Sequence, residues 1–341
     1  MIIQLGCSSI ILQNFWFMKS LKFRILLVFI IAGTLSFGIS FSSRFFISEN
    51  QITTKAIEQN QALIIDEIMQ RVKQDYFQSI EDKDFIANAI RGMLKELDPN
   101  SDYITEEDYK NLLTTSMGLL LPTVRYKFLS TNLGYVRINQ FSGNTATELS
   151  DAINEMINGY KSRDTKLHGL IIDLRNNLGG MFNAAVDVSD LFLTKGIIVS
   201  SEGRSPPSSF IRKANKGDII NGTPMVILVN ANSASASEIV AAALQHHHRA
   251  LIVGKKTYGK GLVQTVLPLS QGSAIKLTTS RYLTPSGQSI HKVGVKPDIL
   301  VEGSRQYPGK KLNAEIDQNN DVQLHEAMKL LNNYPIMHSK H

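Results

Sequence analysis

Two short apolar runs, each followed by a turn and a helical pattern, constrain the fold of this chain most strongly. Residues 169–174 read GLIIDL and residues 224–229 read PMVILV. Apolar runs of this length are typical of strands buried on both faces, as in a parallel sheet. Helical patterns over 145–160, 182–192 and 235–245 precede or follow them. The alternation predicts an α/β core of parallel strands with crossover helices.

Three helical patterns precede this core and predict a small helical unit. Apolar residues recur at helical spacing over 57–77. A second pattern covers 84–97 and stops before Pro99, because a residue that precedes proline avoids the helical region. Thr105 and the three acidic residues after it are typical of the capped start of a third helix, which extends to Leu113.

The remaining segments are less regular. Residues 134–138 alternate as a strand, and residues 254–285 alternate as strands and turns. The stretch 202–221 is polar and basic, so we expect a mobile surface connection there. A short helix is predicted over 321–332.

An uncharged apolar segment near the N-terminus predicts contact with a membrane. Residues 25–43 carry no charge, follow Lys19, Lys22 and Arg24, and end at Arg44. A bilayer core requires ~20 apolar helical residues, and basic residues before a span keep the N-terminus cytoplasmic. The segment is interpreted as an uncleaved anchor, with a cleaved signal peptide and a buried core helix as alternatives. The first two place the body in a bacterial cell envelope: on the inner membrane facing the periplasm, or exported.

Composition excludes several classes of protein. Hydrophobic residues make up 43% of the 341 and charged residues 19%, which excludes a disordered chain. The net charge is +6, but no basic run interleaved with aromatic residues predicts nucleic-acid binding. The single cysteine, Cys7, excludes an internal disulfide, a cysteine-rich zinc site and an iron–sulfur cluster. Consecutive histidines at 246–248 do not share one face of a helix, so we expect neither a metal nor another cofactor.

Residues 230–238, NANSASASE, join a buried strand to an alanine-rich helix. Unpaired N–H groups and the positive end of the helix dipole converge at such a junction. This environment favours the oxyanion that forms when a serine attacks a carbonyl. Ser235 and Glu238 also fit a capping box without chemistry, and this segment alone does not decide between the two interpretations.

A nucleophilic serine requires a base, and Lys260 is the candidate. An ordinary lysine, with a pKa near 10.4, is protonated at neutral pH, but desolvation can lower the pKa to ~7–8. Gly259 and Gly261 would let the backbone pass close to another element and direct Lys260 inward. Gln264 follows on the same face if the segment is a strand. The alternative is a surface lysine in a glycine turn.

Several long motifs, in order, resemble the C-terminal processing peptidases, or tail-specific proteases. The motifs of the core are GYVRINQFS (134–142), LIIDLRNNLGG (170–180), VILVNANSASASEIVAAALQ (226–245), RALIVGKKTYGKGLVQT (249–265), IKLTTSRYLTPSGQSI (275–290) and GVKPDI (294–299). Those of the helical unit are VKQDY (72–76), AIRGMLKELDPNSDYIT (89–105) and EDYKNL (107–112). The resemblance implies a crotonase- or Clp-protease-like α/β core.

The resemblance also implies a serine endopeptidase with a Ser/Lys dyad that cleaves proteins near their C-termini. Ser235 matches the family's nucleophile, Lys260 its general base and Gln264 the glutamine that orients the lysine. The backbone N–H of Ala236 and one N–H from Gly179 or Gly180 match the oxyanion hole. Protein or peptide substrates are therefore the implied partners, and a homo-oligomer or an adaptor is compatible with the family.

Three departures qualify the resemblance. Leu178 replaces the proline usual in the glycine turn, and His246 and His248 replace an acidic residue and a glycine. Only residues 117–132 lie where the family carries a PDZ domain, which binds C-termini by adding a strand. This stretch is far below the ~50 residues of a small domain. A degenerate relative that acts as a binding or assembly module is therefore the alternative function.

The sequence thus predicts five segments. They are a cytoplasmic tail with the membrane segment (1–48), a helical unit (49–116), a short linker (117–132), the peptidase core (133–303) and a C-terminal extension with a short helix (304–341).

Overall fold

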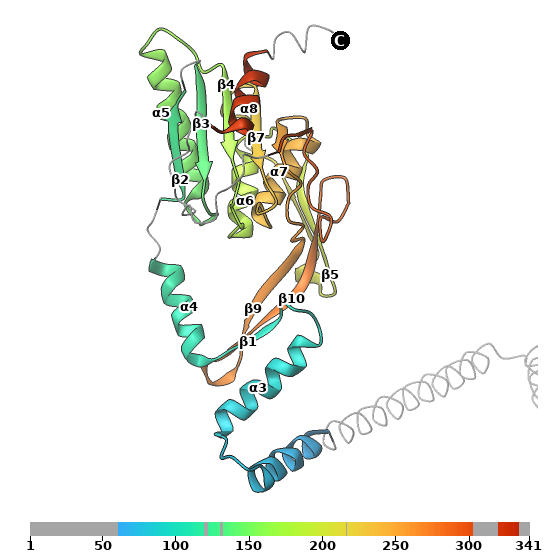
Figure 1. Cartoon of the computed structure of the whole chain (residues 1–341). Helices are drawn as coiled ribbons and strands as arrows, with labels where there is room; N and C mark the ends of the chain where they lie inside the picture. The colour runs from blue at the N-terminus through green and yellow to red at the C-terminus, as the bar shows by residue number, and fades with distance from the viewer. Residues whose placement is uncertain (1–60, 119–121, 130–131, 216, 303–319, 334–341) are drawn as a thin grey trace, which may run out of the picture. The chain divides into compact units, whose positions relative to one another are not determined.

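The computed structural model describes residues 61–118, 122–129, 132–215, 217–302 and 320–333. A six-stranded sheet forms the centre, in the order β11-β8-β7-β4-β3-β2 (Figure 1). Its strands are β2 (Val124–Phe128), β3 (Leu133–Ile138), β4 (Gly169–Asp173), β7 (Met225–Val229), β8 (Leu251–Gly254) and β11 (Ile299–Leu300). All neighbouring pairs are parallel except β2 and β3. The predicted parallel α/β core is confirmed.

Helices cover both faces of this sheet. One face packs on α5 (Thr145–Lys161), α6 (Phe182–Asp190) and α7 (Ala236–His246), which share a buried apolar cluster with Ile172 and Ile227. α8 (Val322–Asn332) lies on the opposite face (Figure 1). Strand residues that alternate with this first set, such as Ile171, are buried there with Leu324 and Leu331 of α8. This alternation follows from the period of two in a strand, and burial on both faces explains why the central strands β4 and β7 are mostly apolar.

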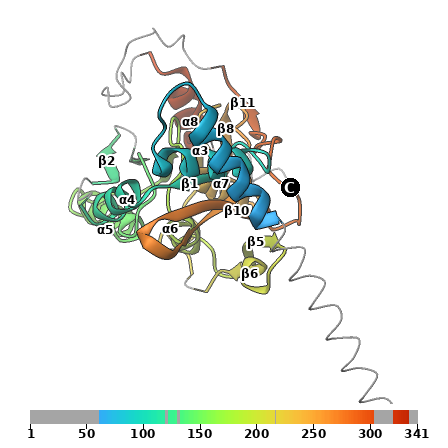
Figure 2. The same cartoon turned by 90° about the horizontal axis from the view of Figure 1, so that it is seen from below.

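A second sheet has the order β1-β10-β5-β6, and β9 pairs with the same strand β10. Its strands are β1 (Asp102–Ile104), β5 (Ile197–Gly203), β6 (Phe210–Lys213), β9 (Leu262–Pro268) and β10 (Ala274–Leu283). β5 and β6 lie side by side and pair in antiparallel fashion (Figure 2). The prediction of a loop over 202–221 is therefore wrong for β6 and the end of β5. The last two residues of β6, Arg212 and Lys213, are both charged, which hid its strand character.

The N-terminal helices comprise residues 61–75, α3 (Asp82–Lys95) and α4 (Glu106–Gly118). The chain divides into two compact units at Phe85 and Ile86. β1, which lies between α3 and α4 in the sequence, pairs with β10. The predicted helical unit therefore contributes a strand to the second sheet. The membrane segment 25–43 lies outside the described residues, and none of the helices within them is long and apolar enough to span a bilayer.

Two predicted boundaries differ from the structure. The linker 117–132 contains β2, which pairs with β3 and is an edge strand of the central sheet. The C-terminal extension contains α8, whose Leu324, Ala327 and Leu331 are buried against the sheet. Both segments are therefore parts of the core, because each supplies backbone pairing or apolar cover that the core strands require.

Candidate active site

Ser235 lies at the N-terminal end of α7, immediately after the loop that follows β7. Its backbone has φ +56° and ψ −112°, a conformation that residues other than glycine rarely adopt. Such strain is concentrated at functional sites, where the surrounding structure holds it. Ser235 is partly buried, and the next residues, Ala236 and Ser237, are buried in the first turn of the helix.

Glu238 joins the turn that carries Ser235 to the loop that carries Lys260. Its side chain is fully buried. One carboxylate oxygen, Oε2, accepts hydrogen bonds from the N–H groups of Ser235 and Lys260, each at 2.8 Å. The other, Oε1, accepts from Gly259 N–H at 2.7 Å and from the Thr257 hydroxyl. Sequence reasoning identified Glu238 only as a helix cap. The spacing of three residues between Ser235 and Glu238 indicated the capping box, but nothing in the sequence indicated that Glu238 contacts the distant Lys260 loop.

The loop around Lys260 is pressed against a second backbone segment. Gly259 has φ +91°, and a Cβ there would lie 3.0 Å from Gly294 N. A Cβ on Gly261 would lie 2.5 Å from His291 N. This is the close backbone approach that the two glycines predict. The Lys260 side chain is partly buried and forms no ion pair within the described part of the chain.

Gln264 lies on β9, where it faces Thr278 of β10 across the ladder. Its Nε2 and the Thr278 hydroxyl are buried without a hydrogen-bond partner among the described residues. A buried polar group without a partner is costly, so each such group calls for an explanation. Gln264 therefore has an uncommitted donor four residues after Lys260.

The predicted glycine turn, Asn176–Gly180, packs directly on Ser235. Gly179 has φ +106°, and a Cβ there would lie 2.9 Å from Ser235 Cβ and 3.1 Å from Ala236 N. Its N–H donates to Asn177 Oδ1 at 2.8 Å. Within the described residues, the N–H groups of Ala236 and Gly180 have no acceptor. Of the two glycines, Gly180 thus retains the free donor.

Asparagine side chains hold this turn against the serine loop. The backbone carbonyl of Asn177 also accepts hydrogen bonds, from Ala234 N–H at 3.0 Å and from the Ser237 hydroxyl at 2.9 Å. Its Nδ2 donates to the Ile138 carbonyl at 2.8 Å. The Asn176 N–H donates to Asn230 Oδ1 at 3.0 Å. Sequence reasoning missed these roles, although asparagine after both strands was a signal for interacting turns.

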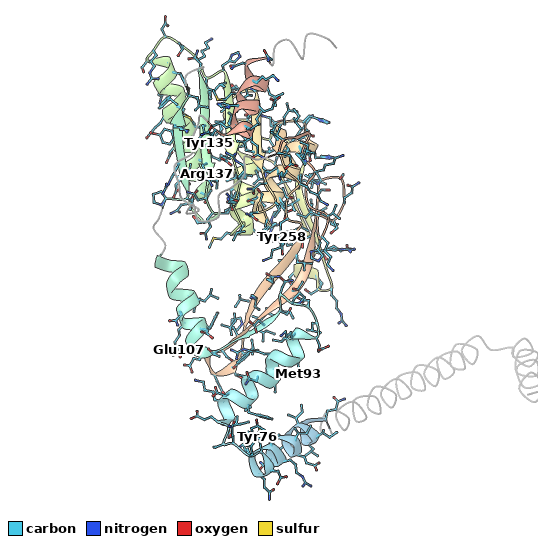
Figure 3. All side chains as sticks on the ribbon, viewed as in Figure 1. Tyr76, Met93, Glu107, Tyr135, Arg137 and Tyr258 are labelled. Atoms are coloured by element: carbon cyan, nitrogen blue, oxygen red, sulfur yellow. The ribbon has the colours of Figure 1, made fainter. Side chains whose placement is uncertain are left out.

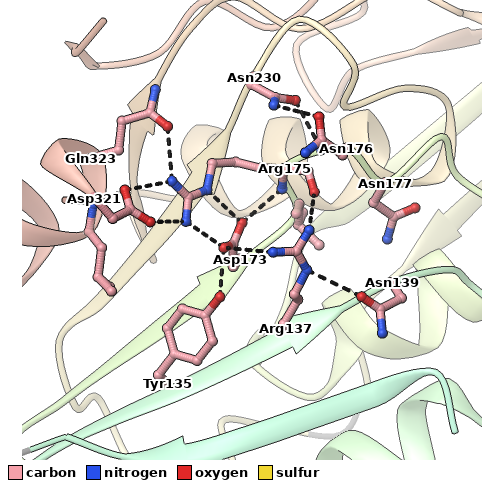
Figure 4. Close-up of polar contacts among 12 residues, drawn as sticks. Tyr135, Arg137, Asn139, Asp173, Arg175, Asn176, Asn177, Asn230, Asp321 and Gln323 are labelled. Carbon is pink, nitrogen blue, oxygen red and sulfur yellow. Dashed lines mark hydrogen bonds and ion pairs between the residues drawn. The ribbon is translucent and has the colours of Figure 1, made fainter. Parts of the chain in front are cut away.

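A buried charge cluster lies at the end of β4, just before the turn (Figure 4). Asp173, fully buried, accepts from the Arg175 guanidinium at 2.7 and 3.0 Å and from the Tyr135 hydroxyl at 2.6 Å. Tyr135 and Arg137 project from the same strand (Figure 3), and Arg137 lies 3.8 Å from the Asp173 carboxylate. Burial alone would raise the pKa of Asp173, but the Arg175 and Arg137 charges and the hydrogen bonds hold it below its ordinary value.

The three consecutive histidines lie at the C-terminal end of α7, whereas Ser235 lies at its N-terminal end. His247 Nε2 lies 2.7 Å from the Ile197 carbonyl oxygen. His248 has φ +51°, the left-handed conformation that favours glycine, which matches the glycine that the resemblance implies there. Within the described residues, no three metal-binding side chains gather into a site.

Comparison with known proteins identifies the relatives of this arrangement. The model for "Peptidase family S41" matches residues 132–301, which include every residue of the candidate site. A carboxy-terminal-processing protease of Bartonella bacilliformis is 30% identical, over 86% of this chain and 94% of its own length. A carboxyl-terminal-processing protease of Synechocystis is 40% identical, over 59% of this chain and 44% of its own length.

A solved lipoprotein of Streptococcus agalactiae has a similar fold, with a TM-score of 0.52. It is 16% identical and covers 79% of this chain and 88% of its own chain. The alignment with the Bartonella protein is 411 positions long, whereas this chain has only 341 residues. At least 70 of those positions therefore hold residues of the relative alone.

Proposed function

The chain belongs to peptidase family S41, a family of serine peptidases, and we propose that Ser235 and Lys260 form its catalytic dyad. The observation that supports this assignment best is the shared hydrogen-bond acceptor. Glu238 Oε2 binds the backbone of both residues and so fixes the turn of one against the loop of the other. Preorganisation of this kind is what nucleophilic catalysis requires.

The first half of the reaction is acylation. Ser235 Oγ attacks the peptide carbonyl carbon while neutral Lys260 accepts the hydroxyl proton. The carbonyl oxygen becomes an oxyanion, which the free N–H groups of Ala236 and Gly180 stabilise together with the N-terminal dipole of α7. The C–N bond then breaks, and Lys260 returns the proton to the leaving amine. Gln264 orients the lysine, with its amide oxygen accepting a hydrogen bond from the lysine amine so that the lysine lone pair stays free for the proton.

Water completes the cycle. It attacks the acyl-enzyme carbonyl, and Lys260 accepts its proton. The second tetrahedral intermediate collapses, Ser235 leaves with the proton from Lys260, and the carboxylate product is released. Lys260 forms no ion pair within the described residues.

The proposed substrates are proteins cleaved near their C-termini. The relatives' names, which refer to carboxy-terminal processing, support this class. We place the enzyme in the cell envelope, anchored or exported through residues 25–43. We also propose that the chain lacks the PDZ recognition domain, and the surplus of at least 70 positions in the Bartonella relative supports this absence.

Cleavage of a denatured protein tests this function. Purified full-length chain and its Ser235→Ala variant are incubated with casein, and the fragments are followed by mass spectrometry. The proposal predicts fragments with the wild type and none with the variant. Fragments from both would refute the nucleophile. A folded wild type that cleaves neither casein nor peptides would favour the degenerate binding module, which the missing segment and His246 motivate.

A further inference from the structure

Arg175 links the C-terminal helix to the turn that faces Ser235. Its guanidinium lies between two carboxylates, that of buried Asp173 and that of Asp321, the N-cap residue of α8 (Figure 4). Asp321 accepts in bidentate fashion, with Oδ1 2.8 Å from Nη1 and Oδ2 2.7 Å from Nη2. Gln323 Oε1 accepts from Nη1 at 3.1 Å. Bidentate arginine–carboxylate pairs are the geometrically most specific ion pairs.

The pair is shielded from solvent and nearly balanced in charge. The side chains of Arg175 and Asp321 are only 12% and 15% exposed. Two guanidinium groups, those of Arg137 and Arg175, face two carboxylates, those of Asp173 and Asp321. Loss of Asp321 would leave one carboxylate to neutralise both cations, and a poorly solvated charge without its partner is unstable.

The Arg175 backbone carries this anchoring into the turn. Its N–H donates to Asp173 Oδ1 at 2.9 Å, and its carbonyl accepts from Arg137 at 3.3 Å. The next residue, Asn176, has φ +60° and begins the turn. Asn177 and Gly179 follow, and Gly179 lies so close to the serine loop that an added Cβ would be 2.9 Å from Ser235 Cβ. Fixing Arg175 therefore fixes the entry to the segment that supplies the Gly180 N–H.

We propose that Asp321 is a positioning residue for the oxyanion hole and acts through Arg175 on the turn Asn176–Gly180. This inference rests on the proposed dyad and adds a C-terminal residue to the machinery. Asp321 lies 146 residues from Arg175 in the sequence. The C-terminal helix therefore has a role besides covering the sheet, because it holds the catalytic turn in its active geometry.

The test separates this role from stability. Asp321 also caps α8, because its Oδ1 accepts from Leu324 N–H at 3.0 Å. Asparagine and serine are equivalent helix caps, so Asp321→Asn and Asp321→Ser keep the cap and remove the charge that pairs with Arg175. Glu326→Gln is the matched control. It removes a carboxylate from the same helix that, among the described residues, forms an ion pair only with exposed Lys329, at 3.5 Å.

The readout is the affinity for a peptide aldehyde relative to the matching peptide alcohol. Ser235 Oγ adds to the aldehyde carbon, its proton passes to Lys260, and the aldehyde oxygen occupies the oxyanion hole. The alcohol binds without forming this oxyanion. We expect both Asp321 variants to lose about 10- to 100-fold in the aldehyde-to-alcohol ratio and in kcat, with KM and alcohol affinity unchanged. Glu326→Gln should match the wild type. Urea unfolding of each variant gives the folded fraction used to normalise these values.

Three results would contradict the proposal. If the wild type prefers the aldehyde and a folded Asp321 variant has the same aldehyde-to-alcohol ratio, the role of Asp321 is refuted and the proposed dyad is not. Equal losses for aldehyde and alcohol would show a purely structural role. A wild type without any preference for the aldehyde would overturn the proposed dyad, and this inference with it.

Discussion

The backbone N–H groups of Ser235 and Lys260 donate to the same carboxylate oxygen, Glu238 Oε2, each at 2.8 Å. Two segments 25 residues apart are thus fixed by one buried side chain. Glu238 accepts four hydrogen bonds and donates none, which suits a carboxylate and no other side chain of this length.

Replacing this carboxylate by an amide should disrupt the site. In Glu238→Gln, the amide NH₂ would face two donors in either orientation, and two buried donors would lose their acceptor. Each costs about 1–3 kcal/mol, so we expect the free energy of unfolding to fall by about 2–6 kcal/mol and kcat to fall at least ~100-fold. Urea unfolding and peptide hydrolysis measure both. Glu202→Gln, at an exposed ion pair with Arg281, should leave both nearly unchanged.

A methyl group at the glycine turn should impair catalysis. In Gly179→Ala, the new Cβ would lie 2.9 Å from the Ala234 carbonyl oxygen and from Ser235 Cβ, at a φ of +106°. The turn must shift, and loss of an oxyanion donor costs about 10²- to 10³-fold in kcat. Steady-state kinetics of the folded variant tests this. Gly143→Ala is the control, because nothing lies within 4 Å of its Cβ position, and it should keep full activity.

Alkaline pH should destabilise the fold through Tyr282. This side chain is buried and stacks on Phe182, and burial raises its pKa to about 12. The unfolded-state value is near 10, so the contribution of Tyr282 to stability is present below pH 10 and is lost as the pH rises through 12. The loss amounts to about 2.7 kcal/mol at most.

The comparison uses Tyr282→Phe, with both proteins carrying Ser235→Ala to prevent self-cleavage. Their free energies of urea unfolding should differ little in pH dependence up to pH 9. Between pH 10 and 12 the free energy of unfolding should fall more for the protein with Tyr282 than for the Tyr282→Phe variant. Parallel curves over that range would mean that Tyr282 has the same pKa in the folded and unfolded states, which would contradict this prediction.

The proposed absence of a PDZ domain predicts weak discrimination at the substrate's terminal carboxylate. We expect kcat/KM for a peptide to change by less than about threefold when its C-terminus is amidated, a difference below 1 kcal/mol in transition-state binding. Parallel assays of the free-acid and amide peptides measure this ratio. Abolition of cleavage by amidation would require another carboxylate-recognising site on this chain.

The sequence predicted the parts of the fold whose signals are local. The apolar runs at 169–174 and 224–229 lie in β4 and β7, because strands buried on both faces need uniformly apolar residues. β2 was hidden, because an edge strand with alternating polar residues, VRYKF, resembles a linker. The helix α8 was predicted, but its position on the sheet was not. An amphipathic pattern shows that one face of a helix is buried, but it does not show which surface that face packs on.

The same limit applies to the site. Ser235, Lys260 and the two glycines carry local motifs, and the structure places Ser235 beside Gly179 and ties it to Lys260 through Glu238. The residues that hold these motifs together act over long sequence separations. Glu238 meets Lys260 across 22 residues and Arg175 meets Asp321 across 146, and neither spacing leaves a pattern in the sequence.

Covalent labelling tests the central claim, that Lys260 activates Ser235, most directly. A fluorophosphonate probe is applied at pH 8 to the wild type, to Lys260→Ala and to Lys255→Ala, a control with the same change at a lysine paired with Glu302. Peptide mapping locates the adduct. The account predicts modification of Ser235 in the wild type and in Lys255→Ala, and at least ~100-fold slower labelling in Lys260→Ala. An adduct on another serine, or equal labelling rates with and without Lys260, would contradict it.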